Sequence, residues 1–396
     1  MKKLPIQIEL PDSFFLAEER CGYEVTQQAK QHWAILLDLM VQLDSVCKEY
    51  GIRYAIDGGT FLGAVRHKGF IPWDNDADVI MLRSEYEKFC KIAPTAFKSP
   101  YFWQTNETDP GTLRRHGQLR NSMTTCILKD EMQDGKPLYD FNQGIFLDVF
   151  ILDAVPDDFD ELSRFEEELQ QALPLLWDFK SYYHVSGKEL WMKDAQRQAF
   201  EEFEATVSRY NDKGTGRIGN ISLIPLRRES MLFAKEIYED FVDYKFEGFS
   251  FPGPRDYETV LTGLYGDWHK FVIGEDMHGS ALLDVYTPYI EYIKKVQINP
   301  QDEILNKEHL ILQLYKHRNT LLKQRDVAWK DIQQMREQHE QLQEQLQKQI
   351  VDMKQNLNDS CNQNERLQIR IKKQSLAIYA LSFVVLVFAI LFFLSL

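Results

Sequence analysis

The composition of the chain changes sharply near residue 300, and this boundary limits the folds open to it. Residues 1–300 mix aromatic and aliphatic residues with glycine and proline, whereas QQMREQHEQLQEQLQKQIVDMKQNLNDSCNQNERLQ (residues 333–368) contains neither glycine nor proline. A polar run of this kind is typical of a long solvated helix rather than of a packed core. We therefore expect one globular domain over residues 1–300, followed by helical segments.

Apolar residues recur in the polar helix with the spacing of a heptad repeat. The a and d positions are Ile332, Met335, Leu342, Leu346 and Met353. The interruptions are His339 and Gln349, with Arg318 and Arg325 further upstream. Because polar a positions weaken pairing, the number of chains stays open. We expect residues 301–374 to form a coiled-coil stalk that joins a homo-oligomer, with a single spacer helix as the alternative.

An uncharged apolar run, SLAIYALSFVVLVFAILFFLSL, occupies residues 375–396. About 20 apolar residues in a helix suffice to cross the hydrocarbon core of a bilayer. Cations precede the run at Arg370, Lys372 and Lys373, and the positive-inside tendency then leaves the preceding chain in the cytosol. We expect a single-pass C-terminal transmembrane anchor, with a buried core helix as the alternative.

The charge and the cysteines exclude several classes of protein. The net charge is -14, from 60 acidic against 46 basic residues, which argues against a nucleic-acid binder. An anionic substrate must therefore meet a local basic patch. The five cysteines form no CxxC pair, so neither a disulfide framework nor a zinc site is predicted. The first residues lack the apolar core of a signal peptide.

Within residues 1–300 the periodicities predict an α+β fold. Residues 27–50 show helical spacing of apolar residues, ended by Gly51. RYAIDGG reads as a short strand that enters a glycine turn, and DADVIM and GIFLDVFIL read as two further strands. Helix-like stretches follow over residues 158–180, 188–210 and 229–244. Separate runs of strands and helices are typical of the α+β class.

Two of these strands carry aspartate in an apolar setting. Asp76 and Asp78 fall in DADVIM, and Asp148 falls in GIFLDVFIL. Residues two apart on a strand face the same side, so Asp76 and Asp78 point together. If the second strand lies beside the first, Asp148 joins them, and such oxygen ligands suit Mg²⁺ or Mn²⁺. Asp74 is a fourth candidate ligand, from the turn before the strand.

A glycine turn and a basic run precede these aspartates. The turn consists of Gly58, Gly59 and Thr60, and the basic run consists of Arg66, His67 and Lys68. Glycines let backbone amides approach a phosphate closely, and the threonine adds a hydroxyl. The basic run would supply the positive charge that an anionic substrate needs. The pattern predicts metal-assisted phosphoryl transfer.

Several motifs also have a non-functional or an alternative interpretation. Aspartate-rich loops are often solvated turns, and an EF-hand counted from Asp74 would place Glu85 at position twelve. Val79 stands where that loop needs glycine, so calcium is set aside. GTGRIG matches a dinucleotide fingerprint but follows a polar segment instead of a buried strand. His269 and His278 have no assigned role. The aromatic share of 13% could cage a quaternary ammonium group, although most rings belong to the core.

The stretch YAIDGGTFLGAVRHKGFIPWDNDADVIMLRSEYEKF resembles the signature of the LicD family of phosphocholine (phosphoalcohol) transferases, which is related to the fukutin group. GIFLDVFILDAVPD resembles the second acidic strand of that family. FEGFSFPGPRDYETVLTGLYGDWHKF resembles its closing segment, and together these matches span most of residues 25 to 280. The chain departs at Asn75, where many relatives have aspartate.

The resemblance implies a nucleotidyltransferase-like fold in which Asp76 and Asp78 bind a divalent ion and Asp148 is the third carboxylate. It also implies that the glycine turn holds the phosphates. The implied reaction moves a phosphoalcohol group from a CDP-activated donor to a glycan hydroxyl and releases CMP, and we predict Asp148 as the base. The acceptor would be a lipid-linked glycan at a bacterial inner membrane. The alcohol stays open among choline, ethanolamine, glycerol and ribitol.

Two other functions remain open at this point. The same carboxylates would serve a nucleotidyltransferase that moves a nucleoside monophosphate from a nucleoside triphosphate onto a small molecule or protein. A membrane-anchored scaffold that assembles through the coiled coil is the non-enzymatic alternative. Pyrophosphate release would reveal the first, and a phenotype that survives Asp76→Ala would favour the second.

Overall fold

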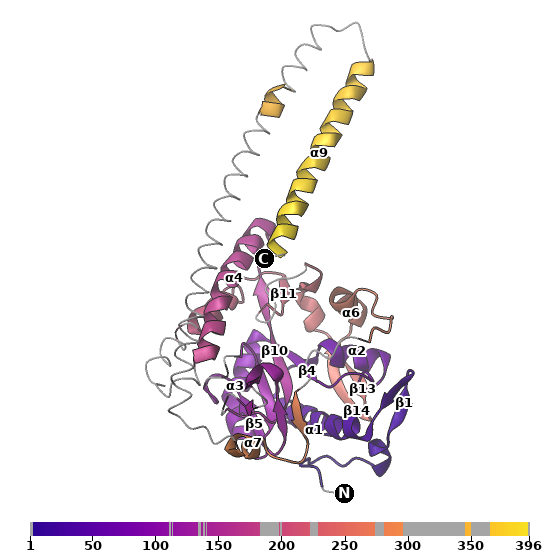
Figure 1. Cartoon of the computed structure of the whole chain (residues 1–396), viewed down its shortest axis with the longest axis vertical. Helices are drawn as coiled ribbons and strands as arrows, with labels where there is room; N and C mark the ends of the chain where they lie inside the picture. Colours follow the sequence, from indigo (N-terminus) through magenta and orange to yellow (C-terminus); the bar gives the residue numbers. More distant parts are fainter. Residues whose placement is uncertain are drawn as a thin grey trace. The chain divides into compact units, whose positions relative to one another are not determined.

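The computed structural model describes residues 3–110, 112, 114–133, 136–137, 139, 141–182, 198, 200–221, 229–273, 281–295, 345–349 and 365–394. It divides into a first unit, residues 1–309, and a second unit, residues 310–396. The first unit combines a mixed sheet with several helices, which confirms the α+β prediction (Figure 1).

Residues 27–50 and 158–180 are helical as predicted, but residues 229–244 form 3₁₀ turns and strand segments instead of the predicted helix. Several helices of the first unit have defined ends. They are α1 (Gln27–Tyr50), α2 (Gly58–Arg66), α3 (Arg83–Ala96), α4 (Phe159–Tyr182), α6 (Tyr257–Tyr265) and α7 (Tyr289–Lys295). Short 3₁₀ turns are η1 (Asp12–Phe15), η2 (Lys129–Glu131), η3 (Glu229–Met231) and η4 (Lys235–Tyr238). Thr26 caps α1 by accepting a hydrogen bond from the Ala29 N–H, and Gly51 ends it in the left-handed conformation, which glycine adopts without a steric penalty.

Seven strands form the central sheet. They are β3 (Ala55–Ile56), β4 (Asp78–Leu82), β5 (Tyr101–Gln104), β6 (Gly117–Asn121), β10 (Ile145–Val155), β11 (Arg217–Gly219) and β12 (Phe233–Ala234). Four two-stranded ribbons pair β1 (Glu18–Arg20) with β2 (Tyr23–Val25), β7 (Thr125–Ile127) with β15 (Leu282–Asp284), β8 (Met132–Gln133) with β9 (Lys136–Pro137), and β13 (Phe241–Phe246) with β14 (Phe249–Pro254).

The long strand β10 organises the sheet. It pairs in parallel with β4, and antiparallel first with β6 and then with β11. The strand order is β12-β11-β10-β4-β3, with β6 also on β10 and β5 on β6. Both α1 and α3 contact β10, and the predicted apolar stripe of α1 is buried, from Trp33 at 0% exposure to Met40 at 1%. The core therefore lies between these helices and the sheet.

The glycine-rich decoy is explained by the fold. GTGRIG runs from a turn at Gly214 into β11, which pairs antiparallel with β10. A dinucleotide loop would instead follow a strand and open a helix. The segment is therefore a sheet edge and not a nucleotide loop.

The second unit is described only in part. α9 (Glu365–Leu394) is its long helix, and residues 345–349 are also helical. A membrane span requires about 20 consecutive apolar residues in one helix. No helix in the described ranges meets the length and apolarity that a span requires, which contradicts the predicted transmembrane helix at residues 375–396 and the single-pass anchor. Most of the predicted coiled coil over residues 301–374 lies outside the described residues.

Candidate active site

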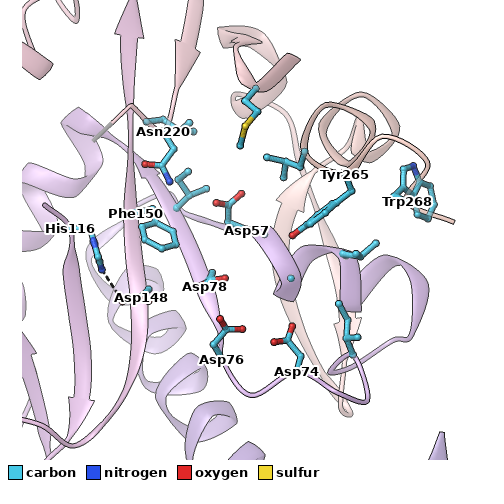
Figure 2. A pocket seen from close by; sticks show the side chains of 18 of the residues that line it. Asp57, Asp74, Asp76, Asp78, His116, Asp148, Phe150, Asn220, Tyr265 and Trp268 are labelled. Atoms are coloured by element: carbon cyan, nitrogen blue, oxygen red, sulfur yellow. Dashed lines mark hydrogen bonds and ion pairs between the residues drawn. The ribbon is translucent and has the colours of Figure 1, made fainter. Parts of the chain in front are cut away.

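A pocket of about 930 Å³ opens against β4, β10 and the N-terminus of α2. Figure 2 shows carboxylates gathered along one side of it, with Tyr265 of α6 opposite them. The carboxylates that line the pocket are Asp57, Asp74, Asp76, Asp78, Asp148 and Asp267. All four predicted metal ligands are therefore in one cavity.

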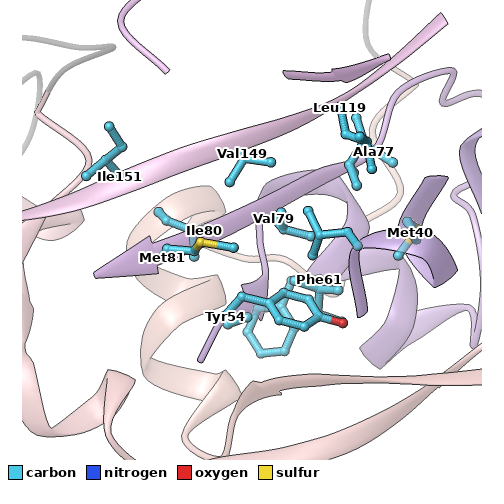
Figure 3. Close-up of a cluster of buried hydrophobic side chains, with 14 of the residues drawn as sticks. Met40, Tyr54, Phe61, Ala77, Val79, Ile80, Met81, Leu119, Val149 and Ile151 are labelled. Atoms are coloured by element: carbon cyan, nitrogen blue, oxygen red, sulfur yellow. The ribbon is translucent and has the colours of Figure 1, made fainter. Parts of the chain in front are cut away.

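Asp78 and Asp148 owe their proximity to strand register. On the parallel pair of β4 and β10, Asp148 lies opposite Asp78, and Phe150 lies opposite Ile80. Because side chains alternate along a strand, these residues face the pocket while Val79 and its neighbours on β10 face the core. Figure 3 shows this apolar side, with Val79, Met81, Val149 and Ile151 together. Burial of the odd positions fixes the register that aligns the two carboxylates.

Asp74 and Asp76 lie in the segment just before β4, which α1 holds in place. The indole N–H of Trp33 donates to the Asp74 carbonyl at 2.9 Å. A ring nitrogen of His32 lies 2.7 Å from the Asn75 carbonyl. A buried loop would otherwise leave these carbonyls unsatisfied. The helix therefore positions the two acidic side chains through the backbone between them.

The glycine pair makes room for carboxylates. A Cβ on Gly59 would lie 2.6 Å from Asp74 Oδ2, and one on Gly58 would lie 3.0 Å from Asp78 Oδ2. Gly58 also has a φ of +52°, which side chains rarely adopt. Asp74 and Asp78 can thus approach the first turn of α2, where the N-terminal end of the helix favours negative charge.

Polar residues that no sequence pattern marked hold Asp148 in place. His116 Nε2 lies 3.0 Å from Asp148 Oδ1, and Gln118 Nε2 donates to the same oxygen at 2.6 Å. Arg120, fully buried, donates to the side-chain oxygen of Gln118. His116 Nδ1 is buried and has no partner in the described part of the chain. These residues fix the Asp148 carboxylate in one orientation.

The site separates the pKa values of its carboxyl groups. Burial raises the pKa of Asp78 well above its ordinary value, and the charges of Asp76 and Asp148 add to the rise. Burial also acts to raise the pKa of Asp148, but His116, Gln118 and Arg114 outweigh it, so the pKa falls below its ordinary value. Asp148 therefore stays ionised at neutral pH, and its neighbours penalise a second negative charge.

Burial also raises the pKa of Asp57, to about 6, and only the Gly58 N–H opposes this rise. Asp57 is 9% exposed and directly precedes α2. No sequence signal marked this carboxylate, because it stands alone between a short apolar strand and the glycine turn. Its place in the pocket is apparent only from the fold.

The predicted phosphate-binding residues divide into two groups. Gly58, Gly59 and Arg66 line the pocket, and Arg66 also donates to the Trp268 carbonyl at 2.7 Å. Thr60 is not a lining residue, because it is buried beneath the turn and accepts a hydrogen bond from the Asp78 N–H at 2.9 Å. Its hydroxyl holds the start of β4.

The rest of the basic run also lies off the pocket. His67 stacks on Phe271, and burial with the charge of Arg66 lowers the pKa of His67 to about 4, so it is neutral at pH 7. Lys68 is exposed and donates to the Val65 carbonyl. Instead, Arg114 and Lys270 join Arg66 among the cations that line the cavity.

Neither late histidine belongs to the described pocket. His269 is exposed and stacks on Trp268, with ring centroids 3.8 Å apart. His278 lies outside the described residues. Across the described ranges, no three histidine, cysteine or acidic side chains already converge closely enough to hold a metal ion. The aspartates line an open pocket and do not form a closed cage.

Part of this pocket lies in a region that is similar to a known protein family. Residues 51–123 match the model described as "LicD/FKTN/FKRP, nucleotidyltransferase domain". This match covers the turn, Asp74, Asp76 and Asp78, so this part of the site is similar to a nucleotidyltransferase domain, and Asp148 lies outside the matched residues. This similarity to the LicD family confirms the resemblance predicted from the sequence.

One relative of the chain has a name that states a particular activity. The chain is 25% identical over 278 residues to the lipopolysaccharide cholinephosphotransferase LicD of Haemophilus influenzae, a match that covers 65% of this chain and 97% of the relative. An uncharacterized protein of Rickettsia typhi is 39% identical over 59 residues, or 15% of this chain and 19% of that protein. The family model and the Haemophilus relative confirm the prediction of a LicD-type phosphotransferase.

Proposed function

We propose that the chain transfers phosphocholine from CDP-choline to a hydroxyl group of a glycan and releases CMP. The observation that carries this proposal is the alignment of Asp78 with Asp148 inside a pocket, in a chain that matches nearly the whole length of a cholinephosphotransferase. Phosphoryl transfer needs positioned carboxylates and cations rather than a covalent intermediate. The pocket supplies both.

The residues present fit a divalent cation. Asp78 is surrounded by further carboxyl groups, and its burial, followed by repulsion from these groups, raises its pKa. A Mg²⁺ ion is usually held by one or two protein carboxylates together with substrate phosphates, so an open pocket without a three-residue cage suits it. Asp76, Asp78 and Asp148 would hold Mg²⁺ or Mn²⁺, with Asp74 beside them. When bound, the ion neutralises charge on the transferred phosphate.

The other groups of the pocket bind and orient the reactants. Arg66, Arg114 and Lys270 provide positive charge for the diphosphate of the donor. The glycan hydroxyl oxygen forms a bond to the phosphorus while the bond from phosphorus to the CMP oxygen breaks. Asp148, held ionised by His116 and Gln118, is the candidate acceptor for the hydroxyl proton. Its lowered pKa makes it a weaker base than a free carboxylate.

The test is CMP release by the full chain with Mg²⁺, CDP-choline and a crude glycan-lipid extract. We expect CMP release that depends on both the acceptor and the metal and is lost in Asp78→Asn. The matched control is Asp240→Asn, which removes an exposed aspartate paired with Arg255. Pyrophosphate release from a nucleoside triphosphate, without CMP from CDP-choline, would instead favour the nucleotidyltransferase alternative.

A further inference from the structure

Asp57 is a buried carboxylate that has no role in the proposed reaction. It occupies the N-cap position of α2, yet its side chain makes no capping hydrogen bond. No basic side chain pairs with it among the residues that the structure describes. A buried carboxylate costs free energy unless a cation compensates it. This cost points to a positively charged ligand.

The walls next to Asp57 are apolar and aromatic. Figure 2 shows Asp57 between Phe150 and Tyr265, on the side of the pocket away from Asp74. Tyr238 is buried near Asp57. Burial, and next the charge of Asp57, raise the pKa of the Tyr238 hydroxyl well above its ordinary value. Phe150 lies one pocket-facing position beyond Asp148 on β10, opposite Ile80. The same cavity therefore changes from acidic to apolar along the strands.

The remaining lining continues this apolar character. It includes Leu152, Ile221, Met231, Leu232, Phe233 and Leu264, with Asn220 as a polar side chain among them (Figure 2). Such walls offer few hydrogen-bond partners, so they suit neither a polyol nor a primary ammonium group, which would leave donors unsatisfied. A quaternary ammonium group has no N–H donors, carries a diffuse charge on methyl groups, and binds to aromatic faces and carboxylates.

We propose that Asp57, with the rings of Phe150, Tyr238 and Tyr265, forms the subsite for the quaternary ammonium group of the transferred alcohol. This proposal rests on the proposed function and names the group that selects its donor. The position fits, because the Asp57 N–H donates to the Asp78 carbonyl at 3.0 Å, which places the two residues side by side. The phosphate at Asp78 and the ammonium at Asp57 would be joined by a short two-carbon linker.

The charge of the ligand can be tested apart from its shape. CDP-choline and CDP-3,3-dimethylbutanol have the same outline, but carbon replaces the charged nitrogen in the second. We expect the full chain with Mg²⁺ to bind CDP-choline at least about tenfold more tightly by calorimetry, as a desolvated cation–π and carboxylate site allows. In Asp57→Asn this preference should fall several-fold, to the part that the aromatic rings alone provide.

The variant is chosen so that the fold survives. Asparagine is as good an N-cap residue as aspartate and has nearly the same volume. The matched control is Asp267→Asn, which removes a pocket carboxylate already paired with Lys270 at 2.9 Å and should keep the preference. Thermal unfolding of each variant checks folding.

The outcomes separate this inference from the proposed function. A preference for CDP-choline that is undiminished in Asp57→Asn, or a wild type without any preference, overturns the subsite. A preference that falls several-fold or more in Asp57→Asn supports the subsite, even if no acceptor yields CMP. CMP release from CDP-choline with an unchanged preference in Asp57→Asn would support the function and overturn the subsite.

Discussion

Asp78 and Asp148 lie opposite each other on the adjacent parallel strands β4 and β10, and both face the same pocket. Their charges repel, and burial adds to the cost of ionising Asp78. This arrangement lowers the stability of the folded chain, and the divalent cation proposed for the site would offset that cost. Such exchanges are common where function needs a destabilised arrangement. Neutralising Asp78 should have opposite effects on stability and activity.

Asp78→Asn should raise the thermal midpoint in EDTA by about 2 °C or more, because a relief of about 1 kcal/mol shifts a domain of this size by that amount. Turnover of CDP-choline should fall on the order of 100-fold or more. Mg²⁺ should raise the midpoint of the wild type but not that of the variant. Scanning fluorimetry and CMP release measure these effects. A lower midpoint with full turnover would assign Asp78 a purely structural role.

His116 should act on metal affinity through Asp148. His116→Phe keeps a ring beside Phe150 but removes the donor to Asp148 Oδ1. Loss of a hydrogen bond to a metal-binding carboxylate typically costs about 10- to 100-fold in affinity. We expect that loss in a Mn²⁺ titration followed by electron paramagnetic resonance, with partial recovery in His116→Gln. The exposed His269→Phe is the control. Equal affinities for all three variants would remove His116 from this role.

Gly59 should tolerate no side chain, because a methyl group would meet Asp74 Oδ2 at 2.6 Å. Gly59→Ala should displace Asp74 and lower turnover by about tenfold or more, as misplacement at a phosphoryl-transfer site does. Gly216→Ala is the matched control, since its Cβ would meet only Asp157, at 3.9 Å. Initial rates of CMP release compare the two variants. A Gly59→Ala variant with wild-type rates would show that Asp74 is dispensable.

The sequence alone predicted the features that depend on local periodicity. The stripe of α1, from Trp33 to Val46, is buried as its helical spacing indicated. The alternation around Asp76 and Asp78 also follows from strand geometry, with Ala77 and Val79 both 1% exposed. Each of these predictions needed only a repeat of 3.6 or 2 residues. They fixed the main carboxylates of the site but not its other walls.

The missed residues depend on tertiary pairing. His116 and Gln118 meet Asp148 because β6 pairs antiparallel with β10, a register that no local pattern defines. The one available signal was the sequence GQLRN, where polar residues occupy a short strand; every position in it is buried. Lys68 was predicted to serve the anionic substrate, but it does not line the pocket. It is next to Arg66 in sequence, but α2 ends at Arg66, so the two side chains diverge.

His67 should make the folded state less stable in mild acid. Burial, then the charges of Arg66 and Arg20, lowers the pKa of His67 to about 4 in the folded chain. The ordinary value is about 6.5, so the unfolded state binds more protons between these two values. Stability is thus complete above pH 6.5 and is lost as the pH falls through about 4. His67 is only partly buried, so solvent screening makes the effect modest.

His67→Phe keeps the stacking on Phe271 and removes this titration. We expect the difference in unfolding free energy between variant and wild type to grow as the pH falls from 6.5 to 4, with the variant favoured at the acid end. Urea unfolding at several pH values gives this difference. A difference that stays constant over this range would show that His67 has the same proton affinity in both states.

The buried ion pair between Arg83 and Asp153 should be costly to break from one side. Two bonds join them, at 2.6 and 2.7 Å, and the side chains are 7% and 0% exposed. Arg83→Met leaves Asp153 charged and buried, which typically costs about 3–5 kcal/mol of unfolding free energy. Glu204, which also pairs with Arg83, is 25% exposed and can turn to water.

Replacing both partners should cost much less, because an apolar pair leaves no uncompensated charge. We expect Arg83→Met with Asp153→Leu to recover most of the loss measured for Arg83→Met alone, by urea unfolding at pH 7. Asn211 would then lose its bond to Asp153, so a small loss should remain. A double variant as unstable as the single one would mean that packing around Arg83, and not its charge, stabilises this part of the sheet.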